Sequence, residues 1–299
     1  MRSQELGQHE NSKNSRSNEK PETTAQKGTK KRKRKEIFIF GNYKHYYGYR
    51  VGQDLEEDPR LKVFKKEWFE SKDCLDIGCN DGTITITIAK KFGCQSILGV
   101  DIDGGRIEDA YWNLRRTVNM SKSKTPSKTS KVEHAKGVDN SQHNVSGPEY
   151  QEIKESPRDC STLQGKDLFD IVSFSKGNFV REWQPPKDKY YDTILCLSVT
   201  KWIHLNWGDD GLITLFVKIW RLLRPGGILI LEPQPWVSYY KNRLVSEVAQ
   251  TNYHKIKIEP EDFQEVLLDK VGFRMVENIT SSLSESKAGF NRPILAFWK

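Results

Sequence analysis

The chain has 299 residues, of which 36% are hydrophobic and 11% aromatic, so it can form a folded core. Its formal net charge is +8, yet residues 1–35 hold eleven Lys or Arg against four Glu, which leaves the remainder nearly neutral. This distribution excludes a basic surface over the whole fold, and a nucleic-acid site there must be a local patch. Five cysteines without a CxxC pair and the lack of a long apolar run lead us to expect neither a metal site nor a membrane partner.

Residues 1–35 predict a disordered basic tail, because they contain almost no apolar side chain before Ile37. The run KGTKKRKRK is typical of a nuclear localisation signal or of a phosphate-binding arm. The alternative is a solvated tail that only aids solubility. We therefore expect a nuclear protein whose folded domain covers residues 36–299.

Strand-length apolar runs alternate with helix-length segments from residue 60 onward, which is typical of a parallel sheet covered by helices. The predicted strands are 74–78, 97–101, 170–173, 193–198 and 227–232. The predicted helices are 60–70, 82–92, 105–118 and 211–223. The β-branched run in 82–92 favours a strand locally, but a strand there would leave two parallel neighbours without a crossover connection.

Two later regions complete the predicted fold. Residues 119–167 are rich in Ser, Lys, Asn and Gly and predict a flexible insertion within the domain. A helix at 260–271 precedes strands at 273–282 and 292–298, and the short loop between these strands makes them antiparallel. The prediction is an α/β fold with a mostly parallel seven-stranded sheet and an antiparallel C-terminal hairpin, the Rossmann-like class I fold of S-adenosylmethionine-dependent methyltransferases.

A glycine loop, DIGCNDG at 76–82, follows the first predicted strand and opens a helix. Gly78 and Gly82 allow close approach of the backbone to a ligand, and Asp101 at the end of the next strand can accept both hydroxyls of a ribose. The loop lacks the third glycine of the dinucleotide fingerprint, which favours a cofactor without a pyrophosphate. S-adenosylmethionine fits this description; the alternative is a simple turn with an incidental aspartate.

Two further segments reach the same predicted edge of the sheet. Asn178 and Phe179 follow the third strand and could pair with and stack on adenine, although the same residues could form an ordinary turn. Leu197 ends the fourth strand beside the pocket. Upstream, GNYKHYYGYR at 41–50 interleaves tyrosines with cations. Such a segment could stack on a base and bind phosphates, or it could pack its aromatic side chains across the sheet. A lid over the cofactor would do both.

The segments LCLSVTKWIHLNWGDDG and LRPGGILILEPQPW carry an unusual density of Trp, His and Lys. Together with GNYKHYYGYR, DIGCNDG, GVDID and GNF, they resemble the signature blocks of the methylphosphate capping enzymes, the RNA methyltransferases of the bicoid-interacting-protein type. The resemblance covers residues 38–118 and 169–299 and leaves out the tail and the insertion. Phe179 stands where the family more usually has tyrosine, which retains stacking and removes a hydroxyl.

The resemblance implies methyl transfer from S-adenosylmethionine to the 5′ terminal (γ) phosphate of a small non-coding RNA such as a 7SK-type small nuclear RNA. Arg60 is then expected to pair with the methionine carboxylate. The family's cofactor contacts fall on Tyr47, Arg60, Gly78, Cys79, Asn80, Asp101, Ile102, Asn178, Phe179 and Leu197.

A phosphate oxygen is already anionic near neutral pH, so this acceptor needs no general base, and positioning with charge stabilisation would supply the acceleration. SVTKW replaces the NPPY-type element expected for methylation of a base amine. Trp202 and Trp207 could either stack on a base or pack in the core. Asn206 and Gln234 could either orient the acceptor or form hydrogen bonds with the backbone of loops. The candidates for gripping the terminal phosphates are Lys201, His204, Tyr46 and Arg50.

Rival functions remain at this point. Within enzymes, the rivals are a methyltransferase acting on an RNA 5′ monophosphate and one acting on a protein side chain. Outside enzymes, the rival is a scaffold that stabilises an RNA within a ribonucleoprotein. The expected partners are an RNA 5′ end and ribonucleoprotein proteins.

Overall fold

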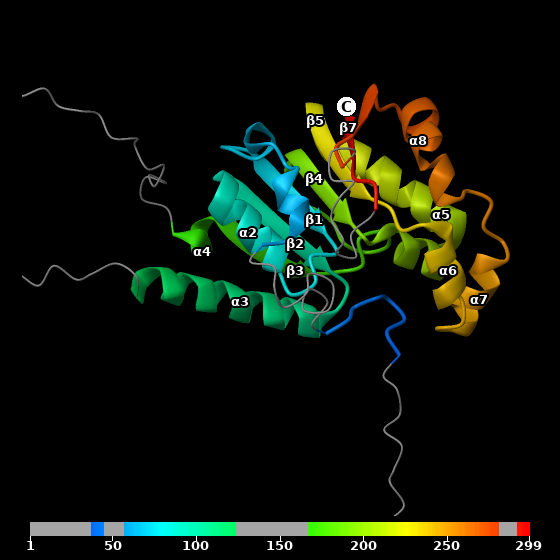
Figure 1. Cartoon of the computed structure of the whole chain (residues 1–299), viewed down its shortest axis with the longest axis horizontal. Coiled ribbons are helices and arrows are strands. Elements are labelled where there is room, and N and C mark those ends of the chain that lie inside the picture. Colours follow the sequence, from blue (N-terminus) through cyan, green and yellow to red (C-terminus); the bar gives the residue numbers. More distant parts are fainter. Residues whose placement is uncertain (1–36, 45–56, 124–166, 281–291) are drawn as a thin grey trace, which may run out of the picture. The chain divides into compact units, whose positions relative to one another are not determined.

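The computed structural model describes residues 37–44, 57–123, 167–280 and 292–299 (Figure 1). The predicted basic tail and residues 124–166 of the predicted insertion lie outside the described residues. So do three of the predicted site residues, Tyr46, Tyr47 and Arg50.

A sheet of seven strands runs through the described chain in the order β3-β2-β1-β4-β5-β7-β6. Neighbours among the first five strands are parallel, whereas β7 is antiparallel to both β5 and β6. This arrangement confirms the predicted α/β fold with an antiparallel C-terminal pair. The strands are β1 (Asp73–Ile77), β2 (Ser96–Asp101), β3 (Val172–Lys176), β4 (Tyr191–Leu197), β5 (Leu223–Glu232), β6 (Met275–Asn278) and β7 (Leu295–Trp298).

Helices cover both faces of this sheet. Because side chains alternate along each strand, successive residues of a strand contact helices on opposite faces. In β5, Ile228 and Ile230 pack in a core with α2 and α3, while Leu229 and Leu231 pack in a second core with α5 and α8. Because both faces are covered, the central strands are apolar almost throughout. The helices are α2 (Thr83–Phe92), α3 (Gly104–Ser123), α4 (Leu168–Ile171), α5 (Thr200–Leu222), α6 (Trp236–Asn242), α7 (Glu247–Tyr253) and α8 (Phe263–Glu265) (Figure 1).

The β-branched segment 83–92 is helical, as the connectivity argument predicted. Its threonines are compatible with a helix because they bond to acceptors nearby. Thr85 donates to Asp76 Oδ2 at 2.6 Å, and Thr87 donates to the carbonyl of Thr83 at 2.7 Å. Its apolar side chains are buried against the sheet, so tertiary packing outweighs the local preference for a strand.

Several predicted boundaries differ from the structure. Residues 60–70 form two short 3₁₀ turns instead of a helix, since Lys65 is extended between them and Phe64 and Trp68 turn inward. Residues 119–123 continue α3, and β3 begins at Val172 after the turn of α4. The predicted helix 260–271 is divided among 3₁₀, α and π turns, and α5 begins eleven residues earlier than predicted.

No helix in the described part of the chain is both long and apolar enough to cross a membrane.

The hydroxyl of Tyr191 in β4 is buried and has no hydrogen-bond partner among the described residues. Burial also raises its pKa to about 12. We expect Tyr191→Phe to raise the free energy of unfolding by about 1 kcal/mol, because it removes an unsatisfied buried group. Denaturant unfolding of the two proteins measures this. A clear loss of stability would show that the hydroxyl has a partner, such as an enclosed water.

Candidate cofactor and acceptor site

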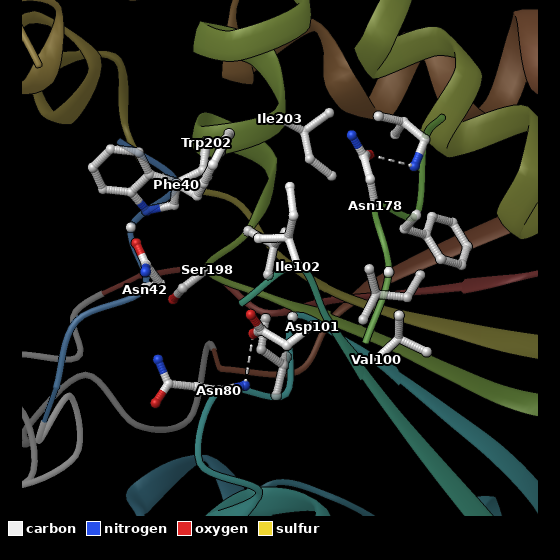
Figure 2. Close-up of a pocket in the computed structure, with 18 of the residues that line it drawn as sticks. Phe40, Asn42, Asn80, Val100, Asp101, Ile102, Asn178, Ser198, Trp202 and Ile203 are labelled. Atoms are coloured by element: carbon white, nitrogen blue, oxygen red, sulfur yellow. Dashed lines mark hydrogen bonds between the residues drawn. The ribbon is translucent and has the colours of Figure 1, made fainter. Parts of the chain in front are cut away.

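A pocket opens at the carboxyl ends of β1, β2 and β4. Its walls come from the turn after β1, the end of β2, the loop after β3, the start of α5 and the described segment 37–44 (Figure 2). In open parallel sheets, ligands bind at the carboxyl ends of the strands where the strand order reverses, which here lies between β1 and β4. The fold thus places the predicted motifs around one cavity.

The glycine loop forms a tight turn that anchors β1 to β2. The N–H groups of Gly78 and Cys79 both donate to the carbonyl of Val100, at 2.7 and 3.1 Å. Gly78 has a φ of 75°, and a Cβ at this position would overlap the side chain of Val199. Glycine is required here because the left-handed backbone and the close approach of α5 leave no room for a side chain.

Asp101 lies at the end of β2 and is 7% exposed. Its carboxylate accepts the N–H of Asn80 at 3.0 Å (Figure 2). It also accepts the N–H of Asp103 at 2.9 Å. Burial raises the pKa of Asp101 to about 6, because the charged form loses solvation, and the two backbone donors offset only part of that cost. The carboxylate is therefore fixed at the pocket wall with acceptor capacity remaining.

The opposite wall is apolar and is built by the loop after β3. Phe179 and Trp183 stack at 5.1 Å, and Asn178 accepts the N–H of Val180 through Oδ1 at 3.2 Å. The amide nitrogen of Asn178 lies on the side of Ile203 (Figure 2). Lys218 of α5 fixes the loop from behind, since its Nζ donates to the carbonyls of Phe179, at 2.8 Å, and Trp183.

The described segment 37–44 closes another side of the pocket. The sequence predicted an aromatic lid at 41–50 but did not single out these residues. Phe40 stacks on Trp207 with ring centroids 5.9 Å apart, and Gly41 lies against the ring of Trp202. Asn42 donates to Asp103, and Asn80 donates to the carbonyl of Tyr43 at 3.3 Å. The segment therefore connects α5 to the glycine loop.

Most of the predicted cofactor residues meet in this pocket, together with lining residues that the prediction did not name, among them Phe40, Asn42 and Ser198. Ser198 follows a buried strand and has a φ of 62°, a conformation that its sequence does not signal. The predicted residues that line the pocket are Gly78, Asn80, Asp101, Ile102, Asn178, Phe179 and Leu197.

Two other predicted cofactor residues are placed elsewhere. The guanidinium of Arg60 is buried between Asp58, at 2.8 Å, and Glu232, at 3.0 Å, and does not line the pocket. The expected pairing of Arg60 with a methionine carboxylate stays a prediction, and in this structure the guanidinium is paired within the protein. The thiol of Cys79 points into the core beside Gly99, and burial raises its pKa well above the usual range.

Of the predicted phosphate ligands, His204 is fully buried. Its Nε2 pairs with Asp209 at 2.7 Å and its Nδ1 lies 3.4 Å from the hydroxyl of Tyr239, so both ring nitrogens have partners within the protein. Burial also lowers its pKa. The predicted contact of His204 with a phosphate stays a prediction; in the structure its ring joins α5 to α6 through Tyr239.

Lys201 lies next to the pocket without lining it. Its Nζ donates to Ser238 of α6 at 2.9 Å and stands 4.2 Å from the ring centroid of Trp202, which does line the pocket. Gln234 accepts the N–H of Lys201 at 3.1 Å and donates to the carbonyl of Ser198, so it is a satisfied loop amide. Asn206 likewise bonds to the carbonyls of Ile39 and Trp202.

The pocket fits S-adenosylmethionine. Asp101 presents a fixed carboxylate suited to ribose hydroxyls, and Ile102, Phe179 and Leu197 give an apolar slot for a purine. Gly78 lines the pocket without a side chain, so its backbone faces the cavity. In the described residues, no three His, Cys, Asp or Glu side chains come together to hold a metal ion.

The sheet order and this pocket define an S-adenosylmethionine-dependent methyltransferase of class I. Residues 191–299 match the model of the Bicoid-interacting protein 3 (Bin3) family. A protein of Arabidopsis thaliana named "Probable RNA methyltransferase" is 60% identical over 90% of this chain and 83% of its own length. The chain belongs to the Bin3 family.

Two further relatives carry names that specify a reaction. The human 7SK snRNA methylphosphate capping enzyme is 40% identical over 91% of this chain, and the chain spans 40% of that protein's length. The U6 snRNA methylphosphate capping enzyme Amus of Drosophila melanogaster is 37% identical over 88% of this chain and 75% of its own length.

Cofactor affinity should depend on the ionisation of Asp101. A carboxylate accepts hydrogen bonds from ribose better than a carboxylic acid, and the pKa of Asp101 is raised to about 6. Affinity should therefore be constant above this value and fall as the pH drops through it. Calorimetric titrations of S-adenosylmethionine between about pH 5 and about pH 8 test this.

The variant Asp101→Asn should bind the cofactor weakly at every pH in that range. Asp76, whose pKa burial also raises to about 6, remains in the variant but does not line the pocket. A pH dependence that persists in Asp101→Asn would assign the titration to Asp76 instead.

Lys218→Met should weaken cofactor binding about tenfold, because it leaves two loop carbonyls without their charged donor and frees Phe179. Lys299→Met is a matched control: Lys299 donates to the carbonyls of Trp220 and Leu223 at 2.8 and 2.7 Å, away from the pocket. Calorimetric affinity and thermal stability should be measured for both. Equal loss of affinity in the two variants would make the effect one of general stability.

Proposed function

We propose that this methyltransferase methylates the 5′ terminal (γ) phosphate of a small non-coding RNA, such as a small nuclear RNA. The observation that carries the proposal is the chemistry of the pocket wall: among its described lining residues, Asp101 alone is ionisable, and we assign it to the ribose. Among the described lining residues, no other side chain is then available as a general base. An acceptor that is already anionic, as a terminal phosphate is, requires none.

The two relatives named methylphosphate capping enzymes support the same acceptor, since each matches nearly the whole of this chain. The cofactor supplies an electrophilic methyl group. The protein's contribution is then to hold donor and acceptor in line and to exclude water. Phe40, Trp202 and Trp207, which line the pocket on the side of α5, are the side chains we assign to this role.

Lys201 supplies positive charge beside this wall. Its Nζ is held by Ser238 and by the face of Trp202 at the start of α5, so the charge is oriented before an anionic acceptor arrives. Such a fixed cation assists transfer most when it stabilises the transition state more than the bound phosphate.

We also propose that residues 1–35 direct the protein to the nucleus, on the basis of the basic run KGTKKRKRK. Deleting this run from a fluorescent fusion should move the signal out of the nucleus. Unchanged nuclear accumulation would leave the tail with a solubilising or RNA-binding role.

The test of the proposed reaction uses labelled S-adenosylmethionine and three matched RNAs that carry a 5′ triphosphate, a 5′ monophosphate or a 5′ hydroxyl. We expect label on the triphosphate RNA alone, and its release with the terminal phosphate on phosphatase treatment. Asp101→Asn should abolish the signal and serves as the control for protein-dependent transfer.

Two outcomes contradict the proposal. Label on the monophosphate RNA alone would identify a 5′-monophosphate methyltransferase. Label on none of the RNAs would favour a protein side chain as acceptor or an RNA-stabilising role in a ribonucleoprotein.

A further inference from the structure

A groove lies between α5 and the loop that follows β3. On α5, Ile213, Val217 and Arg221 line this groove at intervals of four residues, so they form one row along the helix. On the loop, Val180 and Pro185 line the other wall. The four apolar side chains are half-buried, so solvent reaches an apolar strip along the groove.

Positive charge borders the apolar strip. Among the described residues that line the groove, three are cations, Arg181, Lys218 and Arg221, and none is acidic. Arg181, on the loop, and Arg221, on the helix, are both exposed. Glu182 is exposed as well, but it does not line the groove. The groove therefore suits a ligand that combines apolar side chains with negative charge.

Lys218 has a different role from the two arginines. Its Nζ donates to the carbonyls of Phe179 and Trp183, and it stands 4.9 and 5.3 Å from the centroids of their rings. The amine is thus engaged by the loop. Arg181 and Arg221 remain as the cations of the groove that can pair with an anionic ligand.

The groove and the cofactor pocket share a wall. Val180 lines both of them, and its neighbour Phe179 lines the pocket. The N–H of Val180 also donates to Oδ1 of Asn178 at 3.2 Å, and Asn178 lines the pocket as well. A ligand that packs on Val180 from the groove therefore contacts the loop that forms the apolar wall of the cofactor pocket.

We propose that this groove binds an acidic amphipathic helix of a partner protein, and that the bound helix strengthens cofactor binding in the neighbouring pocket. Apolar side chains of the partner pack on the row formed by Ile213 and Val217, and its carboxylates pair with Arg181 and Arg221. Packing on Val180 restrains the loop after β3 before the cofactor arrives, so less ordering remains to be done when the cofactor binds.

The chemistry of the strip favours a peptide over RNA. Surfaces that bind single-stranded RNA combine cations with aromatic rings on which bases stack. None of the described residues that line the groove is aromatic, since the rings of Phe179 and Trp183 are buried on the side of Lys218. Aliphatic walls suit the apolar anchors that a helix presents at intervals of three and four residues.

The test measures binding of fluorescently labelled synthetic peptides of about 15 residues to the full chain. The first peptide carries Leu at positions i, i+3, i+4 and i+7 and Glu elsewhere. The second has Lys in place of Glu, and the third has Ser in place of Leu. A single-stranded RNA is titrated in parallel. We expect the first peptide to bind more tightly than the other two.

The coupling to the cofactor is measured by calorimetry. A saturating amount of the first peptide should raise the affinity for S-adenosylmethionine about fivefold, and saturating cofactor should raise the affinity for the peptide by the same factor. Both readouts are equilibrium affinities, so they do not depend on which acceptor the enzyme methylates.

The variant Arg181→Glu/Arg221→Glu should bind the first peptide about tenfold more weakly, because two attractive contacts become repulsive. Without peptide, its affinity for S-adenosylmethionine should be unchanged. The matched control is Arg115→Glu/Arg116→Glu, which makes the same change of charge. These two arginines are exposed on α3, which packs on the opposite face of the sheet from α5. The control should retain both peptide binding and coupling.

Every variant retains the basic residues 1–35, so a peptide that binds only there would have equal affinity for both variants. Equal affinity of the two variants for the first peptide would therefore overturn the proposed site. Peptide binding that leaves the affinity for S-adenosylmethionine unchanged would overturn the coupling. Weaker binding of RNA by the groove variant, with its peptide affinity intact, would overturn the proposed occupant in favour of RNA.

Discussion

The attachment of the end of β1 to the end of β2 is the constraint on which the site depends. The N–H groups of Gly78 and Cys79 donate to the carbonyl of Val100, and the N–H of Asn80 donates to the carboxylate of Asp101, the next residue of β2. Burial of the Asp101 carboxylate is costly, so the turn must keep its geometry for the charge to remain solvated by backbone donors. The pocket wall and the fold are thus stabilised by the same bonds.

A second buried network holds the other end of the pocket. Glu232, at the end of β5, accepts from Arg60 at 3.0 Å and from the hydroxyl of Ser198 at 2.6 Å. Ser198 lines the pocket in a left-handed conformation, which costs free energy unless neighbouring groups fix it. The ion pair therefore acts on the pocket indirectly: it fixes the residue that connects β4 to α5, and so the direction in which α5 begins.

Sequence patterns predicted the sheet because each central strand is an apolar run set between recognisable turns. They did not reveal the partners that two of the predicted site residues have within the fold. Arg60 meets Glu232 across 172 positions, and His204 finds Asp209 and Tyr239, so each is satisfied in the interior although its residue type suggested a ligand. The two seven-residue helices α6 and α7 are too short to show a reliable helical period.

An interruption at Gly208 explains why the sequence predicted only the second half of α5. It also explains how the first half contacts several neighbours. Gly208 has a φ of 64° and interrupts the helix, so the apolar period visible after residue 211 does not extend through residues 200–207. Those residues point in several directions: Trp202 to the pocket, Leu205 to α6 and α7, and Trp207 to Phe40. A single regular helix buries one stripe, whereas an interrupted one presents different faces to different neighbours. This interruption lets one element contact the pocket, the segment 37–44, and helices α6 and α7.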